Sequence, residues 1–124
     1  MLAVLVSIAL ALWGVWFTPP MIGVQFHQNT QDIDAQGMAW SATFPDGSCL
    51  ISVHPNDFPA LPEGHKMAVV LHEVGHCLGL GHYGDCWDAP TIMASCLLSE
   101  PTERDRIELI RANGYRSYVP MVGH

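Results

Sequence analysis

The segment that most constrains this chain is residues 72–82, His-Glu-Val-Gly-His-Cys-Leu-Gly-Leu-Gly-His. His72 and His76 are four residues apart, so on a helix their imidazoles lie on the same face, one turn from each other. Two imidazole nitrogens at that spacing can chelate one zinc ion. Glu73 is rotated by about 100° from His72 on the same helix, which suits a general base acting on a metal-held water better than a third ligand.

Two glycines allow a third histidine to return to the same place. A helix that simply continued would carry His82 away from the metal. Gly79 can adopt a positive φ at little steric cost, so it can end the helix and turn the chain back, and Gly81 offers a second pivot. Three histidines leave one tetrahedral position open, which is the arrangement of a catalytic zinc site. The segment therefore predicts a metal site formed by His72, His76 and His82.

The pattern His-Glu-x-x-His-x-x-Gly-x-x-His resembles the signature of the metzincin zinc metallopeptidases. That family also carries a methionine-containing turn beneath the metal. Here Met93, within Thr91-Ile92-Met93-Ala94-Ser95, stands eleven residues after His82. The resemblance implies one catalytic Zn²⁺ held by the three histidines, Glu73 as the catalytic base and Met93 as an apolar floor. The implied function is a zinc-dependent endopeptidase acting on a peptide or protein substrate.

Within that family the chain most resembles the matrixin branch, in which the strand before a tight turn pairs with the extended substrate. The corresponding segment is Met38-Ala39-Trp40-Ser41-Ala42, ahead of the turn-forming Pro45-Asp46-Gly47-Ser48. The chain departs from matrixins at Tyr83, where they carry serine, and at Ala94-Ser95, where they carry a tyrosine-proline pair. These positions help to shape the pocket beside the scissile bond.

The apolar patterns around this segment predict an α+β domain. Residues 21–27, 38–44 and 49–53 are typical of strands, and residues 63–76 of a helix that packs on them. The resemblance implies a small metzincin-like fold, with a short twisted mixed sheet on the active-site helix, a methionine turn and a C-terminal helix. We expect Ser99 to cap that last helix and Asn113-Gly114 to end it.

Several polar side chains outside the signature are expected to be solvated, on loops or on the surface. They are Asp32, Asp34, His27, His54 and His65. The alternative for Asp32 and Asp34 is a contribution to a calcium or zinc site, although no glycine-spaced calcium pattern is present.

The beginning of the chain is apolar: residues 1–17 contain no charged side chain. As a helix they would span roughly 25 Å, slightly less than the ~30 Å hydrocarbon core of a bilayer. The favoured interpretation is a retained signal anchor. The alternatives are a signal peptide cleaved near Ala9-Leu10-Ala11 and a buried core helix. We therefore divide the chain into residues 1–20, the apolar segment with a proline linker, and residues 21–124, the catalytic domain. Both export routes place the domain outside the cytoplasm, secreted or anchored to the membrane by residues 1–17.

Charge and cysteine content agree with that compartment. The net charge is −7 and there is no basic patch, which excludes nucleic acid as a partner. Four cysteines are typical of oxidising surroundings. Three pairings are open, and the favoured one joins Cys86 to Cys96 and Cys49 to Cys77. A second zinc bound by cysteines is the alternative, although no CxxC spacing supports it.

A second interpretation of the function comes from a different class of protein: a membrane-tethered zinc-binding module without proteolytic turnover. This interpretation stays open because the domain is short and because Tyr83 and Ala94-Ser95 depart from the matrixin pattern. Glu73 argues against it, because a purely structural zinc site needs no base.

Overall fold

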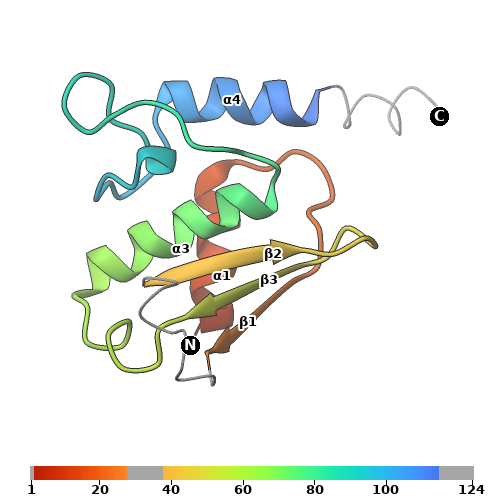
Figure 1. Cartoon of the computed structure of the whole chain (residues 1–124). Helices are drawn as coiled ribbons and strands as arrows, with labels where there is room; N and C mark the ends of the chain where they lie inside the picture. Colours follow the sequence, from red (N-terminus) through yellow and green to blue (C-terminus); the bar gives the residue numbers. More distant parts are fainter. Residues whose placement is uncertain (1, 28–37, 115–124) are drawn as a thin grey trace.

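The computed structural model describes residues 2–27 and 38–114, which form a small α+β domain (Figure 1). The α+β class predicted from the sequence is confirmed, while the metzincin-like assignment stays a prediction. Asp32 and Asp34, and the tail from Tyr115 to His124, lie outside the described residues. The elements in chain order are α1 (Leu2–Trp13), β1 (Ile22–Phe26), β2 (Ala39–Thr43), β3 (Cys49–Val53), α3 (Glu63–Cys77), the 3₁₀ turn η1 (Ile92–Ala94) and α4 (Glu103–Asn113).

The three strands form one mixed sheet with β3 in the centre. β1 pairs with β3 in parallel, and β2 pairs with β3 antiparallel. A tight turn at Asp46 and Gly47 connects β2 to β3. Gly47 has a φ of 90°, a conformation that favours glycine, and Asp46 accepts hydrogen bonds from the backbone N–H and hydroxyl of Ser48. The order leaves β2 at one edge of the sheet, beside α3.

The helix α3 packs across this sheet and carries the first two histidines (Figure 1). Its buried side chains meet the buried residues of β3. The disulfide Cys49–Cys77 fastens the last residue of α3 to the first residue of β3, and a second disulfide joins Cys86 to Cys96. These are the two pairs that the sequence analysis favoured. The buried residues of α3 are Ala68, Val70, Leu71, His72, Glu73, Val74, Gly75 and Cys77.

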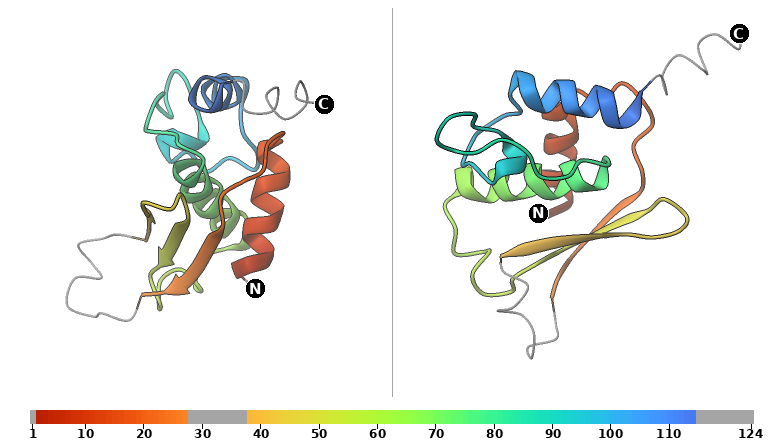
Figure 2. Two further views of the ribbon diagram at one scale, coloured as in Figure 1. Left: turned by 90° about the vertical axis from the view of Figure 1, so that its right-hand side faces the viewer. Right: turned by 45° about the horizontal axis from the view of Figure 1, so that its top comes forward.

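The apolar beginning of the chain is a core helix in this structure, the third of the interpretations drawn from the sequence. Two views show α1 against α3, on the side of the sheet where β1 lies (Figure 2). Trp13 is fully buried, and its indole N–H donates to the carbonyl of Leu71 at 3.0 Å. The guanidinium of Arg106, on α4, donates to the carbonyls of Leu12 and Trp13 at the end of α1. Removal or retention of the segment during export stays a prediction.

No helix in the described parts of the chain is both long enough and apolar enough to cross a membrane. The helix α1 has 12 residues.

One glycine of α3 is fixed by packing rather than by backbone conformation. A Cβ at Gly75 would meet the sulfur of Met93 and the indole of Trp13. α1, α3 and the turn η1 therefore make contact at one point, which only a residue without a side chain can occupy.

The C-terminal helix begins later than predicted from the sequence. Its N-cap is Thr102, not Ser99, because Thr102 and Asp105 form a capping box in which each side chain accepts from the other's backbone N–H. Gly114 ends the helix with a φ of 56°, as expected for the Asn-Gly pair.

Candidate metal centre

The three histidines of the signature come together beside the C-terminal half of α3. Nε2 of His76 lies 3.1 Å from Nε2 of His72 and 3.1 Å from Nε2 of His82. The ligand atoms of all three lie within 4.8 Å of one another. Nitrogens bound tetrahedrally to one zinc ion at 2.0–2.1 Å would be about 3.3 Å apart. The spacing therefore fits a set of ligands around a single metal ion.

The other ring nitrogens determine how these imidazoles are protonated. Nδ1 of His72 lies 2.9 Å from the carbonyl oxygen of Ile92, and Nδ1 of His76 lies 2.8 Å from that of Leu80. A carbonyl can only accept, so both Nδ1 atoms carry a proton, and in the neutral form of each ring Nε2 presents a lone pair. Burial lowers the pKa of the His72 imidazole, which favours its neutral form. Lone pairs that face each other at this distance repel unless a cation lies between them, so the group can hold a metal ion.

Local backbone structure explains how His82 reaches this point. The helix α3 ends in a Schellman motif: the N–H of Leu80 donates to the carbonyl of Gly75, and the N–H of Gly79 donates to that of His76. Gly79 has a φ of 93°, as the sequence analysis expected of a helix-ending glycine. The same motif presents the carbonyl of Leu80 to Nδ1 of His76, so the turn that returns the chain also orients a ligand.

Glu73 lies beside the histidines with its carboxylate inside the protein. The residue is 6% exposed, and its Oε1 atom has no hydrogen-bond partner among the described residues. Burial raises the pKa of the Glu73 carboxyl, against smaller opposing effects from His76 and the Ser41 hydroxyl. A buried carboxylate with an unpaired oxygen is suited to accept a proton from a small molecule.

Met93 is in the turn η1, against the same helix. It is fully buried, and it lines a cavity of about 350 Å³ together with His82. Thr91 caps this turn by accepting from the N–H of Ala94. The carbonyl of Ile92, in the same turn, accepts from His72. The methionine turn is thus in direct contact with the ligand group.

Two cavities meet at Glu73 and lie along β2. One, of about 440 Å³, is bounded by the histidines and by β2. The other, of about 340 Å³, has largely apolar walls and extends from Glu73 toward residues 95–97. Of the predicted edge strand, Ala39, Trp40 and Ser41 line the first cavity and Met38 and Ala39 the second, whereas Ala42 lines neither.

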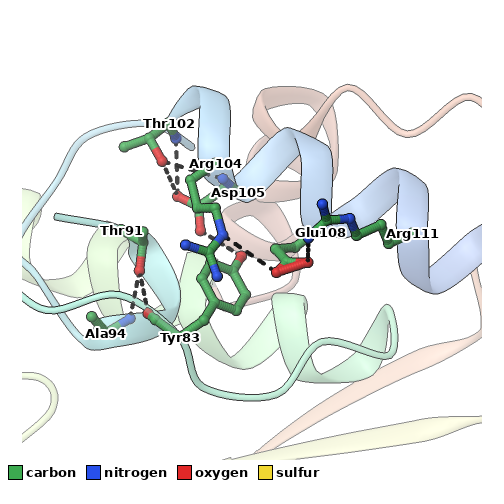
Figure 3. A network of polar contacts seen from close by, with 8 residues as sticks. All are labelled: Tyr83, Thr91, Ala94, Thr102, Arg104, Asp105, Glu108 and Arg111. Carbon is green, nitrogen blue, oxygen red and sulfur yellow. Dashed lines mark hydrogen bonds and ion pairs between the residues drawn. The ribbon is translucent and has the colours of Figure 1, made fainter. Parts of the chain in front are cut away.

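Sequence reasoning did not identify two buried polar residues. His54, predicted at a loop or the surface, is in a loop but only 7% exposed, and its Nδ1 accepts from the backbone N–H groups of Asn56 and Asp57. Asp105 is fully buried on α4 and accepts from the hydroxyl of Tyr83 (Figure 3). It also accepts from the backbone N–H of Ile92 in the methionine turn. The spacing Thr102-x-x-Asp105, which is typical of a capping box, could have indicated Asp105 from the sequence.

Comparisons of this chain with protein families, with curated proteins and with solved structures give no match. The case for a function therefore rests on the sequence and on the geometry of the site.

Proposed function

We propose that this chain is a zinc-dependent endopeptidase of the metzincin type, nearest to the matrixins. The observation that carries the proposal is the convergence of the Nε2 atoms of His72, His76 and His82 beside the buried carboxylate of Glu73. Imidazole nitrogen is a ligand that zinc prefers, and three ligands leave a fourth position open. Two disulfides fit an oxidising compartment, and we propose that the protein works outside the cytoplasm.

The chemistry divides between the ion and the protein. Zinc held by the three histidines would supply a Lewis acid that makes water nucleophilic and polarises the scissile carbonyl. Glu73 takes the proton of the attacking water and later delivers it to the leaving amine. Its unpaired Oε1 leaves a lone pair available for that proton. The carbonyls of Ile92 and Leu80 hold His72 and His76 in the tautomer that this arrangement needs.

The strand β2 supplies a place for the substrate. It pairs with β3 along one edge only among the described strands, and it borders both cavities at Glu73. A peptide added to the free edge would lie beside the three histidines. The cavity of about 340 Å³ next to Glu73 could then receive one of its side chains.

The test is cleavage of a mixed peptide library by the full chain, oxidised and loaded with zinc. The chain is kept whole because α1 is part of the core. We expect cuts that a chelator abolishes. Glu73→Ala should retain zinc and lose roughly 10²–10⁴-fold in rate, the usual contribution of a general base. Glu63→Ala is the matched control, since Glu63 is an exposed residue of the same helix, paired with Lys66.

Three outcomes are distinguishable. Cuts that depend on Glu73 support an endopeptidase. Bound zinc in a folded chain that makes no cuts would favour the zinc-binding module without turnover. A folded chain that binds no zinc would overturn both.

A further inference from the structure

Tyr83 directly follows the third histidine and is held at both ends. Its hydroxyl donates to Oδ1 of Asp105 at 2.6 Å, and its carbonyl accepts from the hydroxyl of Thr91 at 2.8 Å (Figure 3). Its ring lies under the guanidinium of Arg104, 5.1 Å from the ring centroid. A tyrosine fixed in this way also fixes the backbone of its neighbour His82.

Asp105 connects this tyrosine to the opposite side of the site. Its second oxygen, Oδ2, accepts from the backbone N–H of Ile92 at 2.9 Å. The carbonyl of Ile92 in turn accepts from Nδ1 of His72. A single carboxylate therefore lies between the segment that carries His82 and the residue that orients His72.

His82 has the greatest need of such a support. His72 and His76 belong to α3, whose hydrogen-bonded backbone fixes their spacing, whereas His82 lies in an irregular segment. The position of its Nε2 depends on what holds the neighbouring residues.

We propose that Tyr83 is a positioning residue for the metal, which sets the place of His82 through the hydrogen bonds it makes with Asp105 and Thr91. This inference rests on the proposed metal site. Tyr83 is not a catalytic residue in this account, because it acts on the site only through its neighbours. The segment bearing the third ligand and the methionine turn then move as one unit.

The test compares Tyr83→Phe with the wild type. The substitution removes the hydroxyl and keeps the ring beneath Arg104. We expect the dissociation constant for zinc, measured by competition with a chelator, to rise roughly 10–100-fold, as for other residues that orient metal ligands. The visible absorption bands of the cobalt-substituted protein should also change, because they report on ligand geometry.

Thr102→Ala is the matched control. Thr102 donates to the same carboxylate from the other side, at 3.0 Å, and it caps α4, so its loss destabilises the same region. Zinc affinity and the cobalt spectrum should stay at the wild-type values in this variant. If Tyr83→Phe does not fold, Thr91→Val removes the other hydrogen bond to Tyr83 together with the cap of η1, and it should weaken zinc binding more than Thr102→Ala, which removes only a cap.

The possible results separate this inference from the proposed function. A wild-type chain that binds no zinc overturns both. A wild-type chain that binds zinc, with wild-type affinity and spectrum in Tyr83→Phe, overturns the positioning role alone. Equal weakening of zinc binding in Tyr83→Phe and Thr102→Ala would also overturn it, since the effect would then be loss of stability.

Discussion

His72 and His76 lie on a helix that packs in the apolar core, whereas His82 lies on an irregular segment whose next residue, Tyr83, makes two hydrogen bonds. We call α1, the three strands and α3 the core region, and residues 78–114 the polar region. In the core region the fixing contacts are made by buried side chains of α1, β3 and α3. The polar region also contributes buried apolar side chains to this core, among them Leu80 and Met93, and its distinguishing contacts are the hydrogen bonds to Asp105 and Thr91 and one short disulfide loop.

The difference shows how a short chain could position the three histidines of the proposed metal site. Apolar packing gives large but non-directional stabilisation, which suits the element that must simply be rigid. Hydrogen bonds contribute less free energy and more direction, which suits a ligand whose position is not set by a helix. Each region therefore makes its own predictions.

The largest effect is expected in the core region, for Trp13→Ala. Trp13 is fully buried and its N–H is bonded to Leu71, so truncation should lower the free energy of unfolding by about 3–5 kcal/mol. Urea unfolding of the chelator-treated protein measures it. Trp16→Ala, at a side chain 37% exposed, is the control and should cost much less. Equal losses in the two variants would show that α1 does not belong to the core.

The disulfides give the second comparison. Cys49–Cys77 closes 28 residues and Cys86–Cys96 closes 10. On the chain-entropy model, replacing each pair with alanines should lower the free energy of unfolding by about 3.6 and about 2.7 kcal/mol respectively. Denaturant unfolding of both double variants checks the order. The reverse order would mean that strain or residual structure outweighs loop closure.

A smaller loss of stability is expected at Asn113, which joins α4 to the C-cap of α3. The buried amide of Asn113, near the end of α4, donates to the carbonyls of Leu78 and Leu109 at 3.0 Å. Asn113→Ala should lower the free energy of unfolding by about 1–2 kcal/mol, because the Leu78 carbonyl loses a buried donor. Thermal unfolding beside Glu103→Ala, an exposed position on the same helix, provides the measurement. No difference between the two variants would contradict the role given to Asn113.

The smallest expected effect is a gain. Burial raises the pKa of Glu73 above its ordinary value of 4.5, so the folded, metal-free chain binds a proton more tightly there than the unfolded chain does. The stability that the protonated form provides is present below the unfolded pKa and is lost as pH rises through the folded one. Glu73→Gln should therefore be more stable than the wild type at neutral pH with chelator present. The gain should shrink as the solution is acidified, and a gain that persists unchanged in acid would contradict this account.

Local chemistry is what the sequence predicted well. The spacing of His72 and His76, the bend at Gly79 and the tight turn at Gly47 all depend on neighbouring residues, so the pattern alone indicates them. The α+β class follows from the same local periodicities.

What the sequence did not predict depends on distant partners. The apolarity of residues 2–13 suits a bilayer and a protein core equally, because burial of apolar surface drives both. The burial of one face of α1 and its contacts with Leu71 and Arg106 show the helix as part of the core. Likewise, Asp105 accepts from residues 13 and 22 positions away, which no periodicity reveals. Both Ser99 and Thr102 are residue types that cap helices, so the sequence alone did not show that Thr102 is the N-cap of α4.

The contact at Gly75 also has a meaning for ancestry. A zinc-binding pattern treats this position as free to vary, yet the sulfur of Met93 and the indole of Trp13 occupy the space that any side chain would need. We expect a mutation at Gly75 to be best tolerated when Met93 or Trp13 is replaced by a smaller residue at the same time. Positions 13, 75 and 93 should therefore change together during evolution. Correlated residues at positions 13, 75 and 93 would therefore identify chains related to this one, even where the three histidines are all else that the sequences share.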